Sequence, residues 1–589
     1  MEGISSAPGR TSVKRKTGMK YIKRNKEINT IEEAVAHNMG LPGNTDVKAV
    51  INQWYKNSAG GNYQIPVLEE IRDLAGQFKN RPVWIFGDYD CDGVCATSIL
   101  HTALAMDGFS NVRYLLPERS KGYGMSRGMV DMAEEKTGPG LIITVDNGIS
   151  AMDAVDYAKE KGFTVIVTDH HLPKIENGAK VLPNADLILD PNAIDHQAPF
   201  AGYCGAGLAY KLAIQLIGKK AEGLLPYCAI ATCGDQMELR EENYVFVRKG
   251  LAMINRGICP LPIKALIAAN MMEYGHFTSS TLSFRIVPEL NAPGRIDEKE
   301  GAALSCELLL SHNYDFALEI AQQIVEINNK RKEMVKSESE ICIEELEKNG
   351  QPSAPVITVD ESAESGIVGI LAAKLQEKYH FPSIVFTADP DNPETLRGSA
   401  RSVEGFSIID MLRACSSCLE SFGGHEGAAG VRVRRDKLEE FRSTAASYIR
   451  KKGCTFTSPD IGYYDLEIDS KDIAETIKSI EMFAPYGNGN PMPVFKVNGF
   501  VPIPFNRYNT NPYVRQLAGT GIKFTSYYCD ALNFEKWDDM KQICGDRPIT
   551  FYGTLDTNYF QGKETAQITF SGYEKEAPRR NAAVTKIFG

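Results

Sequence analysis

The stretch VWIFGDYDCDG (residues 83–93) sets a short apolar run directly before three aspartates at alternate positions. A run such as VWIF is typical of a strand buried on both faces of a parallel sheet. The side chains of Asp88, Asp90 and Asp92 project to one side of an extended segment, so their mutual repulsion must be offset by water or by a cation. Ligands of parallel sheets collect at the carboxyl ends of the strands. The stretch therefore predicts a buried strand that leads into a candidate cation-binding loop.

Length and composition indicate a multidomain globular protein. The 589 residues are too many for one compact core, so we expect three or four domains. Apolar residues make up 43% of the chain and charged residues 24%, which is ordinary for a globular protein. We find no apolar run of about 18 residues and no signal-peptide core near residue 1. We therefore expect no membrane span and a cytoplasmic location.

Charge is distributed unevenly along the chain. The formal net charge of −10 argues against nonspecific coating of nucleic acid. A basic segment nevertheless precedes Glu27, and it contains Lys14, Arg15, Lys16, Lys20, Lys23, Arg24 and Lys26. This segment is either a solvated tail or an arm that binds phosphate.

Five apolar runs alternate with helical stretches in the first half of the chain. They are VWIF (83–86), VRYLLP (112–117), LIITV (141–145), TVIVT (164–168) and LILD (187–190). Buried strands separated by amphipathic helices are typical of an α/β fold with a parallel sheet.

The remainder of the chain predicts three further regions. Residues 314–349 are charged and helix-favouring, and they predict a long connecting helix. PVITV (355–359), the helix GIVGILAAKL (366–375) and SIVFT (383–387) predict a smaller α/β domain, whereas VFKVNGF (494–500), ITFYGTL (549–555) and AQITFSGY (566–573) predict an all-β barrel. The expected boundaries are a basic lead-in 1–60, an α/β domain 61–313, a connecting helix 314–352, a second α/β domain 353–452, a barrel 458–575 and a tail 576–589.

Four clusters of acidic residues or histidines end four of the predicted segments. They are GDYDCDG (87–93), VDNG (145–148), TDHH (168–171) and CGDQMEL (233–239). Each alone is typical of a capped turn, but three of them follow strands of one sheet and so converge at one edge. The candidate metal ligands in these clusters are Asp88, Asp90, Asp92, Asp146, His170 and Asp235.

This ligand set predicts a site for two divalent cations, with Asp146 as the candidate bridge. Carboxylates combined with an imidazole favour Mn²⁺ over Mg²⁺, which prefers to keep water and few carboxylates.

In this order the four clusters resemble motifs one to four of the DHH phosphoesterase superfamily, named for the triplet present here as Asp169-His170-His171. FRIVPELNAPGRI (284–296), GIVGILAAKL, RGSARSVEGFSIIDML (397–412) and FGGHEGAAG (422–430) resemble its nuclease branch with the DHH-associated second domain. FAPYGNGNPMPVF (483–495) and TLDTNYFQGKETAQI (554–568) resemble the OB-fold of the RecJ single-strand exonucleases. The resemblance runs in order from about residue 65 to residue 573.

The resemblance implies a function and a site. It implies a parallel-sheet DHH domain, a DHH-associated domain joined by a long helix, and a C-terminal OB-like barrel. The implied activity is metal-dependent hydrolysis of single-stranded DNA from the 5′ end to mononucleotides, in DNA repair or recombination. The protein would act as a monomer, with a single-strand-binding protein or a helicase as candidate partners.

The resemblance also assigns residues to roles. It implies that the six ligands hold the metal pair and that His171 faces the scissile phosphate, within a catalytic set of His171, Asp146 and Asp169. The implied contacts to DNA are Asn291, Arg295, Ser399, Arg401, Gly423, Gly424 and His425.

Several of these positions have alternative interpretations. Arg295 and Arg401 could pair with carboxylates across a domain interface, and His425 could be a turn residue. Arg119 and Lys121 either touch nucleic acid or belong to a solvated loop. The candidate base-stacking residues of the barrel, about half of which should instead face its core, are Phe505, Arg507, Tyr508, Tyr513, Tyr559 and Phe560.

The chain departs from the family pattern at two places that bear on the site. ESAESG (361–366) stands where the exonucleases usually have a tryptophan-histidine pair, and Glu289 stands where relatives often carry arginine. Two other functions stay open: a short-oligonucleotide or nucleotide-phosphate phosphatase of the same superfamily, and a nuclease-inactive DNA-binding scaffold. The OB-like region counts against the first, and the complete ligand set counts against the second.

Overall fold

The computed structural model describes residues 20–118, 124–176, 178–297, 301–348, 354–390, 392–454, 456, 461–500, 514–516, 522–525, 549–560 and 563–575. The chain forms two compact units. The larger unit contains residues 47–456 and 484–491, and the smaller unit contains residues 1–46, 457–483 and 492–589. Among the described helices, none combines the length and the apolar character that crossing a membrane requires.

A five-stranded parallel sheet forms the first layer of the larger unit. Its strands lie in the order β3-β2-β4-β5-β8, and all the pairings are parallel. The five predicted apolar runs form these strands: β2 (Val83–Phe86), β3 (Val112–Leu115), β4 (Leu141–Val145), β5 (Thr164–Thr168) and β8 (Leu187–Leu189). Every residue of β2 and β4 is buried, as a strand covered on both faces requires.

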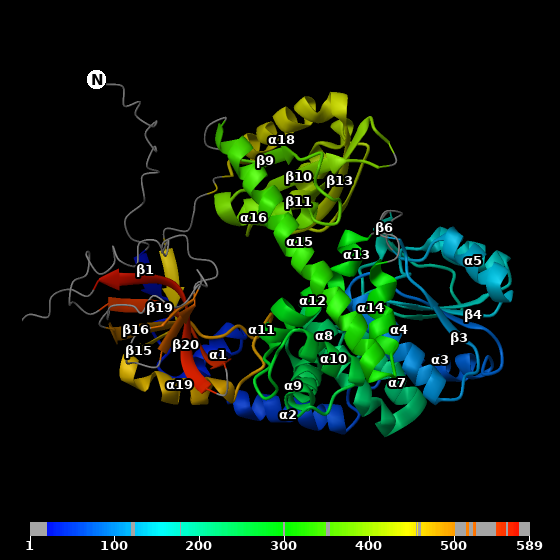
Figure 1. Ribbon diagram of the computed structural model, residues 1–589, viewed down its shortest axis with the longest axis horizontal. Coiled ribbons are helices and arrows are strands. Elements are labelled where there is room, and N and C mark those ends of the chain that lie inside the picture. The colour runs from blue at the N-terminus through cyan, green and yellow to red at the C-terminus, as the bar shows by residue number, and fades with distance from the viewer. Residues whose placement is uncertain are drawn as a thin grey trace, which may run out of the picture. The chain divides into compact units, whose positions relative to one another are not determined.

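Helices cover both faces of this sheet (Figure 1). Ile85 and Ile143 face α3 (Val67–Gly76), α4 (Cys91–Met106) and α7 (Gly205–Ile217), whereas Trp84 and Ile142 face α5 (Arg127–Thr137) and α6 (Met152–Glu160). A two-stranded hairpin, β6 (Lys174–Glu176) and β7 (Ala179–Val181), precedes β8. Because the strands alternate their side chains between two apolar layers, the strand ends are fixed in position.

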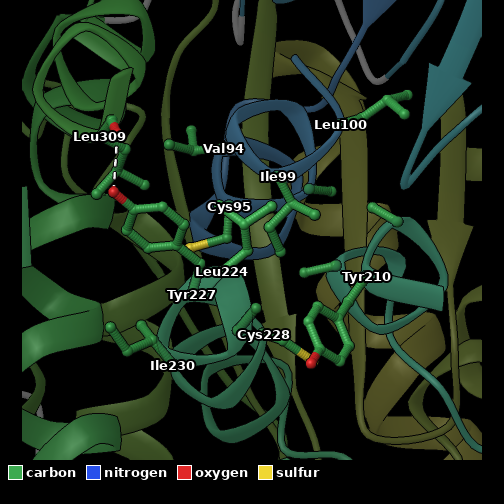
Figure 2. Close-up of a cluster of buried hydrophobic side chains, with 14 of the residues drawn as sticks. Val94, Cys95, Ile99, Leu100, Tyr210, Leu224, Tyr227, Cys228, Ile230 and Leu309 are labelled. Atoms are coloured by element: carbon green, nitrogen blue, oxygen red, sulfur yellow. Dashed lines mark hydrogen bonds between the residues drawn. The ribbon is translucent and has the colours of Figure 1, made fainter. Parts of the chain in front are cut away.

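A helical layer continues the same core. It contains α2 (Val47–Ala59), the 3₁₀ helix η2 (Gly218–Leu224), α8 (Leu225–Gly234), α9 (Glu241–Asn255), α10 (Leu261–Ala269) and α14 (Gly301–Leu310). Figure 2 shows Cys95, Cys228 and Tyr210 among the buried side chains of this core. The hydroxyl of Tyr227 donates to the carbonyl of Leu309 at 2.8 Å, so the polar tip of this buried ring is satisfied.

A short irregular helical stretch then leads to the connecting helix. It contains α11 (Ser279–Thr281), the π-helix η3 (Leu282–Ile286), α12 (Val287–Asn291) and α13 (Pro293–Ile296). The connecting helix α15 spans Tyr314–Lys348, in agreement with the helix predicted from residue 314.

A second, mixed sheet follows in the order β12-β13-β11-β10-β9. Only β9 and β10 pair in parallel, and the other pairings are antiparallel. The elements of this part are β9 (Val356–Val359), α16 (Val368–Tyr379), β10 (Ser383–Ala388), β11 (Thr395–Arg401), α17 (Ile408–Ala414), the 3₁₀ helix η4 (Ser416–Cys418), β12 (Ser421–Gly424), β13 (Ala428–Arg434), η5 (Arg435–Lys437) and α18 (Leu438–Lys452). It is the smaller α/β region that the sequence predicts.

The smaller unit is built from both ends of the chain. A six-stranded sheet in the order β15-β16-β19-β20-β18-β17 is its main layer. Its strands are β15 (Leu466–Asp469), β16 (Phe495–Phe500), β17 (Val514–Gln516), β18 (Ile522–Thr525), β19 (Ile549–Phe560) and β20 (Lys563–Lys575). It also contains β1 (Lys20–Lys23), α1 (Ile31–Asn38), β14 (Ile461–Tyr464), the 3₁₀ helix η6 (Ser470–Asp472) and α19 (Ile473–Glu481).

This unit differs from the prediction in two respects. The C-terminal part is not all-β, because α19 buries Ile473, Ile477 and Ile480 at helical spacing. The end of the basic segment is part of a sheet and not a solvated tail, while its binding of phosphate stays a prediction. β1 pairs in parallel with β14, and the ring of Tyr21 stacks on that of Tyr552 with centroids 3.7 Å apart. Lys14, Arg15 and Lys16 lie outside the described residues.

Candidate active site

The four acidic clusters occupy neighbouring ends of their elements. Asp88 and Asp90 lie between β2 and α4, and Asp92 lies in the first turn of α4. Asp146 is the first residue after β4, and Asp169-His170-His171 follows β5 directly. Asp235 is the C-cap residue of α8. Strands β2, β4 and β5 are parallel neighbours, so their carboxyl ends bring these loops together.

The six predicted ligands form two groups of three. In each group the candidate ligand atoms lie within 4.8 Å of one another: Asp88, Asp90 and Asp146 in the first group, and Asp92, His170 and Asp235 in the second. The imidazole of His170 joins them, because its Nε2 lies 3.0 Å from Asp146 Oδ1 and 3.6 Å from Asp92 Oδ2. Asp146, His170 and His171 meet the same distance limit. The fold thus places every predicted ligand at one site.

Backbone amides hold the aspartates of the first cluster. Asp90 is the N-cap of α4, and its carboxylate accepts from the amides of Asp92 and Gly93. Both oxygens of Asp92 accept amides at the start of α7, from Gly205 at 2.7 Å and from Ala206 at 2.8 Å. Asp92 therefore ties the loop after β2 to the positive end of a second helix.

Asp146 has a strained backbone that its neighbours make possible. Its φ is +62°, in the left-handed region that only a few non-glycine residues adopt. A Cβ at Gly205 would lie 2.4 Å from the Cβ of Asp146 and 2.8 Å from its Cα. Gly205 thus serves the site twice, since its amide binds Asp92 and its missing side chain makes room for Asp146.

Asp169 orients the two histidines and uses both of its oxygens in doing so. Oδ1 accepts from the amide of His170 at 2.7 Å and lies 2.7 Å from Nδ1 of His171, while Oδ2 accepts from the amide of Ile149 at 2.9 Å. Burial by itself would raise the pKa of the Asp169 carboxyl, but the hydrogen bond and the charge of His171 outweigh burial and lower this pKa. This aspartate is fully buried and orients its neighbours.

The electrostatics of the cluster favour a bound cation. Burial and the charges of Asp92 and Asp90 raise the pKa of Asp235 to about 8. The same two causes raise the pKa of Asp146 well above its ordinary value, and burial lowers the pKa of His170 so that its imidazole is neutral. Crowded carboxylates beside a neutral imidazole are the donors that a divalent cation takes, so the residues fit the predicted metals.

Sequence reasoning missed three residues that hold the site. Asn147 donates from Nδ2 to the carbonyls of Phe86 and Val145, both at 2.9 Å, and so joins the ends of β2 and β4. Asn192 donates to the carbonyl of His170 at 2.5 Å. Asn147 lies in the VDNG cluster (145–148), so the sequence pattern places it at the site. Gly205 and Asn192 carry no local signal, because their partners are far away in the sequence.

Asn291 lies in contact with the site, and its amide oxygen binds the protein itself. Oδ1 accepts from the amide of Cys91 at 2.8 Å, between Asp90 and Asp92. The residue expected to contact DNA thus positions the metal-site loop.

Three of the other predicted contact residues gather at the start of α16, around Gly366 just before the helix and Gly369 in its first turn. The guanidinium of Arg295 donates to the carbonyl of Gly366 at 3.2 Å, and a Cβ at Gly366 would lie 1.9 Å from the carbonyl oxygen of Arg295. On β11, Arg401 donates to Ser399 Oγ at 2.9 Å. A Cβ at Gly369 would lie 2.9 Å from Arg401 Nη2 and 3.1 Å from Ser399 Oγ. Two glycines of one helix start therefore bring both arginines and the serine close.

Gly423 and Gly424 end β12, and His425 follows them in the turn to β13. Gly424 has φ +143°, and a Cβ there would lie 2.4 Å from the carbonyl oxygen of Ala428. The amide of His425 donates to the same carbonyl at 2.8 Å, and its side chain is exposed. Arg119, Lys121, Phe505, Arg507, Tyr508 and Tyr513 lie outside the described residues, as does the side chain of Phe560. Tyr559 lies on β19.

The two departures from the family pattern have local partners. Glu289 is buried on α12, and its Oε1 lies 3.8 Å from Lys332 Nζ on α15. Burial raises the pKa of Glu289. In ESAESG, Oε2 of Glu361 accepts from Arg435 at 3.3 Å.

Comparison with known proteins identifies the family. The profile of the DHH family, N-terminal domain, matches residues 82–233, that of the DHHA1 domain matches 352–451, and that of the RecJ OB domain matches 464–571. The single-stranded-DNA-specific exonuclease RecJ of Haemophilus influenzae is 34% identical over 440 residues, which cover 70% of this chain and 74% of that protein. The chain belongs to the RecJ family.

Two further relatives extend this comparison. RecJ of Bacillus subtilis is 32% identical over 514 residues, or 86% of this chain, and the chain spans 63% of the length of that relative. RecJ of Thermus thermophilus, solved in complex with Mn²⁺, superposes with a TM-score of 0.70 at 22% identity and covers 93% of this chain and 78% of that one. At that identity the superposition shows the RecJ fold.

Proposed function

We propose that this protein is a metal-dependent exonuclease that hydrolyses single-stranded DNA from the 5′ end to mononucleotides. The observation that carries the proposal is the convergence of six metal-type ligands in two groups of three at the carboxyl edge of the parallel sheet. Family membership supports the substrate, since the relatives are named single-stranded-DNA-specific exonucleases.

Two divalent cations would be held by the two groups, with Asp146 and His170 at their junction. Bound cations of this kind stabilise charge on a phosphate and lower the pKa of a coordinated water. We propose Mn²⁺ over Mg²⁺, because His170 is a neutral nitrogen donor among the carboxylates. The Thermus relative has been solved in complex with Mn²⁺ and also with Mg²⁺, which supports a divalent cation at this site.

His171 would act on the strand through Nε2. Its Nδ1 is fixed against Asp169, and its side chain is 37% exposed. Burial by itself would lower the pKa of His171, but the hydrogen bond and charge of Asp169 raise this pKa to about 9. In the metal-free protein the ring is therefore an imidazolium at neutral pH, and in that form it can donate to a phosphate oxygen or to the leaving 3′ oxygen.

Arg295, Ser399 and Arg401 would set the register of the strand. Arginine forks bind phosphate oxygens, and the first turn of α16 adds the positive end of a helix. Each cut breaks the bond between phosphorus and the 3′ oxygen, so it leaves a new 5′-phosphate on the shortened strand. A site that holds this phosphate would position the next bond, which accounts for 5′ polarity. Gly423, Gly424 and His425 offer amides and an imidazole at an exposed turn for the same strand.

The test is product analysis with Mn²⁺ on two single-stranded oligonucleotides, one labelled at the 5′ end and one at the 3′ end, with Asp90→Ala as the control. We expect immediate release of a labelled mononucleotide from the 5′-labelled strand only, and no release by the control. Hydrolysis confined to very short oligomers would instead indicate the phosphatase. Metal binding without any cleavage would indicate the scaffold.

A further inference from the structure

The π-helix η3 presents an exposed aromatic side chain beside the candidate metal site. Leu282 and Ile286 of this turn are buried, whereas Phe284 is 67% exposed and Arg285 next to it is also exposed. Single turns of π-helix are frequently found at functional sites. Full burial of a phenylalanine side chain stabilises a fold by about 2 kcal/mol, and the exposed ring of Phe284 contributes little of this stabilisation.

Contacts of its neighbours fix Phe284 relative to the metal ligands. The hydroxyl of Ser283 donates to the carbonyl of Cys233 at 3.2 Å, two residues before Asp235. A Cβ at Gly234 would lie 3.1 Å from the side chain of Val287 and 3.6 Å from the sulfur of Cys91. Ser283 and Val287, on either side of Phe284, thus pack against the segment that carries Asp235, and the sulfur of Cys91 lies close to the same segment.

The same stretch continues into groups already assigned to the site. Asn291 binds the amide of Cys91, and Arg295 donates to the carbonyl of Gly366 just before α16. Phe284 therefore begins a continuous segment, residues 284–295, whose Asn291 and Arg295 lie at the site. Leu172, directly after His171, is 65% exposed, so apolar surface borders the site there as well.

We propose that Phe284 and Arg285 form a stacking platform for an unpaired base of the substrate strand, adjacent to the metal site. The inference rests on the proposed nuclease function and names the contact that selects single strands. An aromatic face and a guanidinium stack on any base, so the platform is indifferent to sequence. A base held in a duplex cannot offer its face to Phe284, so paired DNA would lose this contact.

Kinetics on oligothymidylate test the platform. Phe284→Ala should raise KM on the order of ten-fold, the usual effect of losing one stacked base, and should leave kcat nearly unchanged. Phe284→Tyr and Phe284→Trp should restore KM. The matched control is Phe316→Ala at the start of α15, a side chain 45% exposed for which we find no role at the site, and it should behave as the unmodified protein.

Abasic substrates distinguish stacking from packing. Oligonucleotides with one abasic position, moved stepwise from the 5′ end, should reveal one position at which the unmodified protein loses affinity and Phe284→Ala loses nothing further. Equal losses by both proteins at every position, or a KM unchanged by Phe284→Ala, would overturn the proposal. A large fall in the melting temperature of Phe284→Ala together with such equal losses would assign the ring to packing.

Binding without hydrolysis separates this inference from the nuclease assignment. The fluorescence of Phe284→Trp, corrected for the unmodified protein, should be quenched by oligothymidylate in EDTA or Ca²⁺ and should respond at least several-fold more weakly to a fully abasic strand. Quenching in a protein that does not cleave DNA would support the platform and reject the nuclease. Cleavage without quenching would support the nuclease and reject the platform.

Discussion

At the scale of single residues, other groups of the protein hold the metal ligands in place. Asp92 is held by two amides of α7, and Asp146 keeps a left-handed backbone beside a glycine. Both carboxylate oxygens of Asp169 are hydrogen-bonded, to the amide of Ile149 and to Nδ1 of His171. The metal-binding side chains are therefore arranged before a cation binds, as a preorganised site requires.

Gly205→Ala should strongly weaken cation binding while leaving a folded protein. The added methyl would meet the Cβ and Cα of Asp146, so the loop or the start of α7 must shift, at a cost of about 1–3 kcal/mol. We expect cleavage to fall by about a hundred-fold or more, since misplacement by 1 Å has effects of that size. Gly223→Ala is the control, because a Cβ there has nothing within 4 Å. Normal Mn²⁺ affinity in Gly205→Ala, measured by calorimetry, would contradict this assignment.

Cation binding should release protons near neutral pH. The Asp235 carboxyl has a pKa of about 8 without metal, so much of it is protonated at pH 7 and must lose its proton to bind. Affinity should therefore rise with pH until about pH 8. Calorimetry in buffers of different ionisation enthalpy counts the protons, and Asp235→Asn should release fewer. A pH-independent affinity would show that the carboxylates are already ionised.

At the scale of elements, the loops after the strands and the first turn of α16 do most of the positioning. The turn after β8 is an example, because Asp190 accepts the amides of Asn192 and Ala193 while Asn192 holds the carbonyl of His170. Likewise, Gly366 and Gly369 allow α16 to approach Arg295 and Arg401.

Asp190→Asn should stabilise the metal-free protein increasingly as pH rises from about 4 to 7. Burial, and then the charge of Asp169, raise the pKa of Asp190 from 3.8 to about 7. The unfolded chain therefore ionises first, and stability falls through this range by up to about 4 kcal/mol and then levels off. Asn can still accept both amides. Denaturant melts in EDTA measure the difference.

Asp153→Asn provides a control of opposite sign. Asp153 pairs with Arg127, and this pairing lowers the pKa of the Asp153 carboxyl. The pair therefore adds to the free energy of unfolding at pH values above the ordinary pKa of aspartate, and this stabilisation is lost in acid. A difference between Asp190→Asn and the unmodified protein that does not change with pH would contradict the assignment.

Gly366→Ala should weaken DNA binding without affecting the metals. A Cβ would lie 1.9 Å from the carbonyl oxygen of Arg295, so α16 and α13 must separate and the arginines lose their common site. We expect KM to rise by about ten-fold or more, with Mn²⁺ affinity unchanged. Gly128→Ala, where a Cβ has nothing within 4 Å, is the control. Loss of Mn²⁺ binding in Gly366→Ala would show that the two regions do not act separately.

At the scale of the whole molecule, local patterns predicted what depends on local sequence. The five strands of the parallel sheet and the connecting helix follow from continuous apolar runs and a long charged helical stretch, although the edge strands β3 and β8 are only partly buried. Convergence of the aspartates followed from the rule that parallel strands share one edge. The spacing of Ile473, Ile477 and Ile480 is also typical of a helix such as α19, although the strand-like runs that follow it favour an all-β region.

Contacts between distant residues could not be predicted in this way. The pairing of β1 with β14, and hence the joining of residues near both ends of the chain in one unit, has no signature in either segment. The same holds for the bond of Asp92 to Gly205, which lies 113 residues away. The resemblance supplied roles for Arg295 and Arg401, but only the three-dimensional arrangement shows that glycines of one helix bring them close.

The central claim is that two groups of three ligands hold two cations and that both are needed for hydrolysis. The direct test is to count Mn²⁺ bound per chain by equilibrium dialysis and to measure cleavage in parallel, for the unmodified protein, Asp88→Asn and Asp235→Asn. We predict two ions in the unmodified protein, one in each variant, and loss of cleavage in both. One ion in the unmodified protein, or a count that neither substitution changes, would contradict the account.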